Sequence, residues 1–268
     1  MTSMTSMTCE SGCPTARQAC VFLGRYGALL LGCGATCIRL QKNIDRIART
    51  WGVTANVTIM PRHLHITVSD AEGDDLFTAI DAVPHCPVSF YLNTRLSSLS
   101  WEVADCRLGY DDTVSRFDNI RSAGAGGPGF LTELSLVACA NASFCRLFGG
   151  DLMAMAVVAV ATMAGYYLKS SLLRHHADIR VAVMASAFVS AVLAAGDSLM
   201  GLSNTPDIAL GTSVLYLVPG VPFLNSFSDM LYRHYICAFS RLVDATVLTV
   251  CLSTGLCAGM LLMNQGMF

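Results

Sequence analysis

The chain has 268 residues, of which 53% are hydrophobic and only 13% are charged, and its formal net charge is −2. A soluble domain carries about twice that charged fraction, and here the charged residues crowd into the part of the chain before Gly129. This composition excludes an ordinary soluble protein and shows no basic footprint for nucleic acid. It predicts a soluble N-terminal domain followed by a membrane domain. Together with the patterns described below, it leads us to expect an α-helical integral membrane protein with five transmembrane helices and an N-terminal cytoplasmic α+β domain.

The N-terminus is rich in Thr, Ser and Met and lacks the basic region and apolar core of a signal peptide. We expect a flexible tail over residues 1–14, a folded domain over 15–122, a Gly-rich linker over 123–129 and the membrane domain over 130–268. Twelve cysteines occur along the chain. They lack the paired spacing of a structural metal site, so we expect reduced thiols that pack as small apolar groups.

The pattern from Thr15 to Trp51 is helical and is interrupted by "GCGAT" at residues 32–36. The second half of this segment carries basic residues three or four positions apart, which form one stripe on a helix: Arg39, Lys42, Arg46 and Arg49. Such a stripe is typical of a solvated helix face. The alternative is a surface that rests on the anionic headgroups of a membrane leaflet.

Apolar residues then alternate with polar ones. "VTANVTIM" (53–60) and "LHITVS" (64–69) predict paired strands, and "VSFYLNTRL" (88–96) predicts a third. His63 and His65 lie on one side of a strand, but no acid or cysteine stands at matching spacing, so we expect no metal site. A short helix is expected over "DDTVSRFDNIRS" (111–122) at the end of the domain.

Five apolar runs follow, and we interpret each as a membrane span whose ends extend into flanking polar residues. They are Phe130–Cys145, Leu152–Leu168, Val181–Gly196, Ile208–Leu224 and Ala245–Met263. Lys and Arg alternate between the connections, being frequent before the first span and in the second and fourth connections. This alternation places the N-terminus in the cytoplasm and the C-terminus outside, in the inner (plasma) membrane.

The fourth run contains helix breakers where a span should be continuous. In "LVPGVPFLNS" (217–226), Pro219 and Pro222 each free a carbonyl about four residues earlier, and Gly220 relaxes the backbone between them. Freed carbonyls inside a bilayer are tolerated only against protein or a hydrated cavity. Polar residues flank the break, and the nearest are Asn204, Asn225 and Asp229. The pattern predicts a substrate-binding site of a secondary transporter; the alternative is a proline kink.

A zwitterionic substrate at the break needs acceptors for its ammonium group and a cation for its carboxylate. Freed carbonyls and Asp229 are the expected acceptors. Arg146, in "FCRLFGGD" at the end of the first span, is the expected partner of the carboxylate. The alternative role of Arg146 is to pair with Asp151 at the membrane surface.

Two features of the spans suggest a partner protein. Glu133 in the first span and the face formed by Gly255 and Gly259 in the last have no obvious mates within five helices. Five is also an odd number, whereas transporters are often built from paired repeats. We therefore expect an obligate complex with a second membrane protein.

Three segments resemble the threonine/serine exporter (ThrE) family, and in particular its split, YjjP-like branch. They are "ARQACVFLGRYGALLLGCGAT" (16–36), "FCRLFGGD" (144–151) and "SNTPDIALGTSVLYLVPGVPFLNSFSDMLYRHY" (203–235). The resemblance implies export of threonine and serine or of succinate-like dicarboxylates, together with a small, all-membrane YjjB-like partner subunit. Many relatives have an acidic residue after the turn that precedes the second helix, where this chain has Cys37.

Two other functions compete with export. A membrane-anchored hydrolase is disfavoured, because the sequence has no nucleophile elbow, no His-Glu-x-x-His motif and no phosphate-binding glycine loop. We expect no enzyme activity and no cofactor. A non-transporting regulatory or assembly subunit, with the pore formed by the partner, stays open.

Overall fold

The computed structural model describes residues 14–70, 73, 76–84, 86–124, 129–201 and 203–263, except for the side chains of Ser198 and Leu199. The chain divides into two compact units, each described by itself below. The N-terminal unit comprises Met1–Gly127 and Val221–Leu242, and the C-terminal unit comprises Pro128–Gly220 and Val243–Phe268. Most of the expected tail and linker, residues 1–13 and 125–128, lies outside the described residues.

The N-terminal unit contains a three-stranded antiparallel sheet in the order β1–β2–β3. Its strands and its helices α1–α4 are, in chain order, α1 Ala16–Gly32, α2 Cys37–Thr50, β1 Thr54–Ile59, β2 His63–Ser69, β3 Leu76–Ala82, α3 Phe90–Ala104 and α4 Tyr110–Ala123. Val57 of β1 pairs with Ile66 of β2, which pairs in turn with Ala79 of β3. Leu64, Ile66 and Val68 of β2 are buried while their neighbours are not, so one face of the sheet packs on the core.

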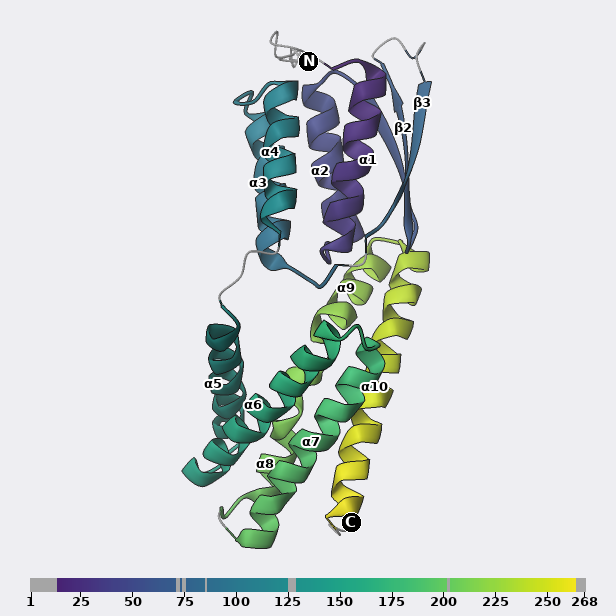
Figure 1. Cartoon of the computed structure of the whole chain (residues 1–268). Coiled ribbons are helices and arrows are strands. Elements are labelled where there is room, and N and C mark those ends of the chain that lie inside the picture. The colour runs from purple at the N-terminus through teal and green to yellow at the C-terminus, as the bar shows by residue number, and fades with distance from the viewer. Residues whose placement is uncertain are drawn as a thin grey trace, which may run out of the picture. The chain divides into compact units, whose positions relative to one another are not determined.

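Helices α1 and α2 lie between this sheet and the pair α3–α4 (Figure 1). An aromatic cluster fills the core, in which the Phe22 ring lies 5.3 Å from Trp51 and 5.5 Å from Phe117. The Tyr26 hydroxyl donates a hydrogen bond to the Leu96 carbonyl oxygen at 2.8 Å, which ties α1 to α3. Thr15 caps α1 and Thr36 caps α2, so both helices begin where a hydroxyl satisfies a free amide.

The expected third strand at residues 88–96 is wrong. This segment begins α3, which Ser89 caps by accepting a hydrogen bond from the Leu92 amide. The buried residues of α3 include Leu92, Leu96, Leu99 and Val103, a helical spacing that becomes visible only beyond the window read as a strand. The third strand is instead β3, which the sequence analysis did not identify. The first two strands and the helix at 111–122 are confirmed.

The C-terminal unit is built from apolar helices. The elements after the linker are α5 Phe130–Leu147, α6 Leu152–Arg174, α7 Ile179–Met200, α8 Pro206–Ser213, the 3₁₀ turn η1 Leu215–Leu217, α9 Gly220–Leu231 and α10 Tyr235–Leu262. Of these, α9 belongs mainly to the N-terminal unit and α10 spans both units. Four described helices are long and apolar enough to cross a membrane, namely α5, α6, α7 and α10. The fifth candidate is the bent pair Pro206–Leu217 and Gly220–Leu231. The protein is therefore a helical membrane protein with four to five candidate spans.

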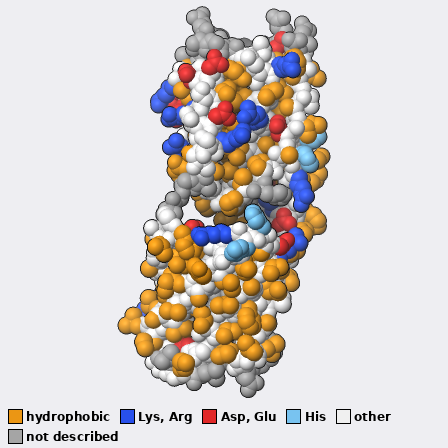
Figure 2. Space-filling view, viewed as in Figure 1, with side chains coloured by type: hydrophobic (Ala, Val, Ile, Leu, Met, Phe, Trp, Pro, Cys, Tyr) orange, Lys and Arg blue, Asp and Glu red, His pale blue; other side chains and the backbone are white. Residues whose placement is uncertain are grey.

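The surface of these helices is apolar. Figure 2 shows hydrophobic side chains covering the visible face of the C-terminal unit, where few charged side chains occur. Leu131, Leu152 and Leu261 are among the exposed leucines. A continuous apolar surface on long helices is what a bilayer solvates.

Helix α10 packs closely on α7. A Cβ atom at Gly255 would approach the Ala187 Cβ to 2.9 Å and would overlap the Met184 carbonyl oxygen. A Cβ atom at Gly259 would lie 2.7 Å from the Ala191 Cβ. The expectation that this glycine face has no mate within the chain is therefore wrong, because small residues of α7 let the two backbones approach.

Glu133 also has neighbours within the chain. It interacts with Tyr166 and Lys169 of α6, so the expectation that it lacks a mate is wrong too. Nine cysteines in the described part of the chain are free thiols. Cys106 is an exception to the expected reduced state, since it is disulfide-bonded. No group of three or more metal-ligating side chains occurs among the described residues.

Candidate functional site

The expected break in the fourth span is present, and Pro219 and Gly220 form it. Helix α8 ends at Ser213, η1 ends at Leu217, and Val218 has an extended backbone conformation before α9 begins at Gly220. The two helical segments are bent by 61° at this point. Pro222 lies in the first turn of α9, where a backbone amide has no partner within the helix and a proline costs no hydrogen bond.

The carbonyl groups at the end of α8 are satisfied by a side chain from another helix. The Asn141 side-chain amide of α5 donates to the carbonyl oxygen of Thr212 at 3.0 Å and lies 3.5 Å from that of Ser213. It also donates to the Thr162 hydroxyl of α6 at 2.6 Å. Because Asn141 is only 3% exposed, this one side chain connects three helices at the break without help from solvent.

A second set of polar groups lies on α6, α7 and η1. The Ser190 hydroxyl is 3.1 Å from the Tyr216 hydroxyl and 3.1 Å from the Ala161 carbonyl oxygen. Gly165 permits this approach, because a Cβ atom there would overlap both hydroxyl oxygens. Ser186, one helical turn before Ser190, is fully buried, and its hydroxyl makes no hydrogen bond within the described residues.

We refer to these side chains together as the polar core: Asn141, Thr162, Ser186, Ser190, Thr212, Ser213 and Tyr216. Polar groups inside a membrane domain are costly unless they serve packing or function. Packing does not explain why a buried hydroxyl such as that of Ser186 has no hydrogen-bond partner. The polar core therefore has hydrogen-bonding capacity to spare at the level of the broken span.

A cavity of about 250 Å³ opens beside the polar core. Its lining combines apolar side chains with two members of the polar core: Val137, Ala140, Asn141, Phe144, Leu215 and Tyr216. Mostly apolar walls with a few polar groups are typical of small-molecule sites. None of the lining residues carries a charge, so specificity here rests on hydrogen bonds.

Asn225 and Asp229 of α9 lie together in the N-terminal unit, at the turn between α1 and α2. The Asn225 side-chain amide donates to the Gly34 carbonyl oxygen at 2.8 Å. One Asp229 carboxylate oxygen accepts a hydrogen bond from the Cys37 amide at 2.8 Å. The other lies 2.9 Å from the Arg241 guanidinium of α10, which also donates to the Ala35 carbonyl oxygen at 2.8 Å.

We call this group, Asp229 with Cys37 and Arg241, the Asp229 cluster. The Asp229 side chain is fully buried, and its charge faces the N-terminus of α2, where the helix dipole favours an anion. The hydrogen bond with the Cys237 thiol, burial and the negative charge of Asp229 all raise the pKa of the Cys37 thiol. In this conformation both Asp229 oxygens have partners within the chain, so a substrate ammonium group would have to displace Arg241.

Arg146 and Asn204 belong to the C-terminal unit and form a second group. Arg146 donates to the Gly150 carbonyl oxygen at 3.1 Å. The backbone amide of Asn204 donates to the Asp151 carboxylate at 2.8 Å, and the Ala154 amide does so at 2.7 Å. These two amides lower the pKa of Asp151. The residues predicted for one site thus occur in two units, and the structure describes no pairing of Arg146 with Asp151.

Most of the polar core, and Arg241 as well, are site residues that the sequence patterns did not predict. The available signal was the presence of single polar residues inside apolar runs, such as Asn141 in "VACANASF". Ser186 and Ser190 stand four positions apart, which places them on one face of a helix. That spacing can be recognised in the sequence, but the helices that pack against it cannot.

The comparisons with known proteins agree with the resemblance. The family model described as "Putative threonine/serine exporter" (ThrE) matches residues 21–263. A protein of Escherichia coli (strain K12) named "Probable succinate transporter subunit YjjP" is 28% identical over 230 residues, which cover 85% of this chain and 88% of that protein. A protein of the same name from Klebsiella aerogenes is 25% identical over 232 residues, covering 86% and 88%. No solved structure matches the chain.

Proposed function

Because this chain belongs to the threonine/serine exporter family, we propose that it is a subunit of a two-component secondary exporter of small polar metabolites in the inner membrane. The second component is a small YjjB-like membrane protein that supplies the remaining helices. The word "subunit" in the names of both relatives supports a partner. The odd number of candidate spans, if the bent pair counts as one, supports it as well.

The observation that carries this proposal is the polar core at the broken span. A transporter needs uncommitted hydrogen-bonding groups at membrane depth, next to backbone that has left the helix. Asn141 ties the end of α8 to α5 and α6, while the hydroxyl of Ser186 stays unpaired. We infer that a substrate carboxylate or hydroxyl takes up this spare capacity during passage, with Pro219 and Gly220 forming the break and Pro222 in the helical turn that follows it.

Two substrate classes are consistent with the family and its named relatives: threonine or serine, and a succinate-like dicarboxylate. The two classes should differ in how they interact with the negatively charged Asp229. In our proposal Asn225 and Asp229 of the N-terminal unit receive the ammonium group of an amino acid. Arg146 and Asn204 of the C-terminal unit are proposed separately as contacts of a carboxylate. A dicarboxylate has no ammonium group and would be repelled by an ionised Asp229.

The test uses both subunits in proteoliposomes and measures counterflow of labelled threonine, serine and succinate. Asn141→Leu is expected to abolish flux, because it removes the amide that connects three helices and leaves carbonyls unsatisfied. Ser143→Ala is the matched control on the same helix, since Ser143 is exposed and its hydroxyl bonds only to the Cys139 carbonyl oxygen. Co-purification of the partner confirms that each variant assembles.

Asp229→Asn separates the substrate classes in the same assay. It should reduce threonine flux while sparing or improving succinate flux. Equal loss for both substrates in an assembled complex would identify Asp229 as structural only. Unchanged flux for Asn141→Leu would remove the polar core from the transport path.

One observation favours a second candidate, a regulatory or assembly subunit whose partner forms the pore. Within this chain, one Asp229 oxygen accepts a hydrogen bond from the Cys37 amide and the other forms an ion pair with Arg241, as expected of a structural contact. This candidate predicts that Asn141→Leu and Ser143→Ala give the same flux in assembled complexes.

A further inference from the structure

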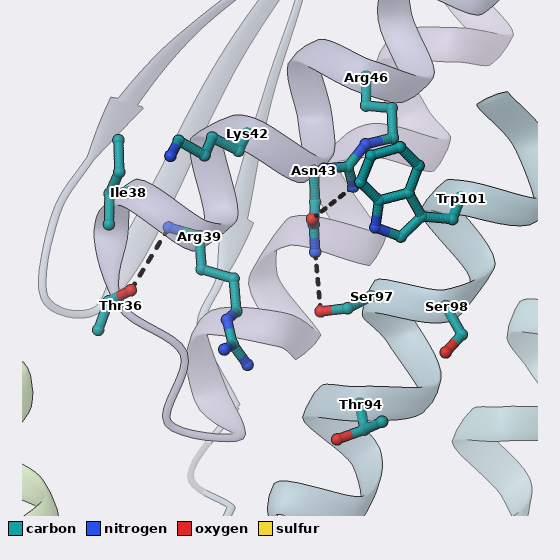
Figure 3. Close-up of a pocket in the computed structure, with 10 residues that line it drawn as sticks. All are labelled: Thr36, Ile38, Arg39, Lys42, Asn43, Arg46, Thr94, Ser97, Ser98 and Trp101. Carbon is teal, nitrogen blue, oxygen red and sulfur yellow. Dashed lines mark hydrogen bonds between the residues drawn. The ribbon is translucent and has the colours of Figure 1, made fainter.

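A pocket of about 540 Å³ lies between α2 and α3 in the N-terminal unit. Figure 3 shows the residues that line it. They come from the start and middle of α2 and from the facing side of α3: Thr36, Ile38, Arg39, Lys42, Asn43, Arg46, Thr94, Ser97, Ser98 and Trp101. This volume is within the range of small-molecule sites, roughly 300–1,000 Å³.

The pocket collects positive charge without a balancing acid. Three cations of the basic stripe, Arg39, Lys42 and Arg46, line it, and none of the lining residues is acidic. Elsewhere in the N-terminal unit, arginines such as Arg25 and Arg116 pair with carboxylates. Lys42 makes no ion pair or side-chain hydrogen bond in the described part of the chain. If the basic stripe were only a solvated helix face, its cations would not need to line a pocket together.

Two of the cations are held in place by neighbouring side chains, most of which are buried. The Arg46 guanidinium lies over the Trp101 ring, 3.7 Å from its centroid, and donates to the Asn43 side-chain oxygen at 2.9 Å. It also donates to the fully buried Ser100 hydroxyl at 2.5 Å. The Arg39 guanidinium donates to the Asn93 side-chain oxygen at 3.1 Å. Groups fixed in this way lose little conformational entropy when a ligand binds.

The remaining polar groups are mainly donors. The Thr36 hydroxyl accepts a hydrogen bond from the Arg39 backbone amide, and the Ser97 hydroxyl accepts one from the Asn43 side-chain amide at 3.2 Å. The hydrogen atom of each hydroxyl is thereby left to donate. In Figure 3, Thr94, Ser97 and Ser98 lie along α3, across from Arg39 on α2. Guanidinium, ammonium and hydroxyl donors facing one space are suited to a multiply charged oxyanion.

We propose that the α2–α3 pocket binds a phosphate ester. Its phosphate contacts Arg39, Lys42 and the α3 hydroxyls, and its organic body rests against Ile38 and against Trp101, a residue that is 56% exposed. A phosphate monoester carries a charge between about −1.5 and −2 near pH 7 and three acceptor oxygens, which balances most of the local charge. The large volume accommodates more than the anion alone. This site is separate from the polar core, so its test does not depend on transport.

Such an ester reaches the pocket either from solution or as the headgroup of a phospholipid. Glycerol 3-phosphate is a soluble probe that carries the chemistry common to both sources. The full chain is placed in nanodiscs of neutral phosphatidylcholine and titrated with this probe. Binding is followed by calorimetry and by Trp101 fluorescence, with Trp101→Phe as the optical control.

We expect saturable binding that Lys42→Gln and Arg39→Gln each weaken by at least about tenfold, because each loses a charge-assisted contact. Arg49→Gln is the matched control, since Arg49 belongs to the same stripe on α2 but does not line the pocket. It should bind as the unmodified chain does. Circular dichroism checks that the variants remain folded.

Nanodiscs containing phosphatidic acid distinguish the two sources. Loss of glycerol 3-phosphate binding in these discs identifies the lipid headgroup as the competing ligand, and retained binding identifies a soluble ester. Absence of binding in neutral discs, without any Trp101 response to phosphatidic acid, would overturn the proposal. Equal weakening by Arg49→Gln, or preferential binding of succinate, would overturn it as well.

Discussion

The carboxylate of Asp229 accepts a hydrogen bond from the backbone amide of Cys37 at 2.8 Å, across 192 positions of sequence. A residue of α9 therefore completes the first turn of α2, where the family resemblance leads one to expect an acidic residue in place of Cys37. The acid that faces this helix N-terminus comes from a distant segment. Arg241 then balances its charge.

The buried pair of Asp229 and Arg241 should show strong coupling. Asp229 is fully buried, whereas the Arg241 side chain is 20% exposed. Arg241→Gln should therefore lower the free energy of unfolding by about 3–5 kcal/mol, because it leaves a buried carboxylate uncompensated. Asp229→Asn should lower it by less. The double variant should recover part of the loss. Chemical unfolding in detergent, followed by tryptophan fluorescence, measures this cycle, and strictly additive losses would contradict it.

The contact between α7 and α10 leaves no room for a methyl group at Gly255. Gly255→Ala is expected to destabilise the membrane helices by about 1–3 kcal/mol, because the new Cβ overlaps the Met184 carbonyl oxygen. Gly211→Ala in α8 is the control, since a Cβ there meets no atom within 4 Å. Thermal unfolding of the two variants in the same detergent compares them. Equal melting temperatures would show that α10 does not pack on α7 in this way.

The Cys37 thiol should be unreactive at neutral pH. Its raised pKa means that the neutral thiol is favoured in the folded chain and that the reactive thiolate forms only at higher pH. Maleimide labelling of the unmodified chain, resolved by mass spectrometry, should modify Cys37 at least about tenfold more slowly than the partly exposed Cys86 at pH 7.5. The difference should persist at pH 9. Comparable rates would contradict both the burial and the hydrogen bond with Cys237.

The proposed orientation has a direct test. Single cysteines at Ser171 and Ser203, introduced into a cysteine-free chain, should be labelled from opposite sides of the membrane by an impermeant reagent. Ser171 precedes the basic connection between α6 and α7, and Ser203 lies in the connection between α7 and α8, where Lys and Arg are absent. Labelling of both positions from outside would contradict the proposed topology.

Several features follow from the sequence alone. Long apolar runs with few charges can be stable only in a bilayer, and helix formation there requires no knowledge of neighbours because the hydrogen bonds are local. The break at Pro219 and Gly220 was predictable for the same reason, since proline acts on its own helix. Strands β1 and β2 were visible because strict alternation marks one buried face.

Other features depended on contacts between distant segments, which a local pattern does not encode. Residues 88–96 alternate like a strand, yet packing against α2 selects the helix α3. The polar core arises because Asn141, Thr162 and Thr212 come from three helices that meet only in the folded chain. The residues that contact Gly255 and Asp229 are likewise determined by packing. Sequence thus determined which segments enter a membrane and where one of them breaks, while tertiary structure decided which polar groups meet there, because burial and pairing are properties of several segments at once.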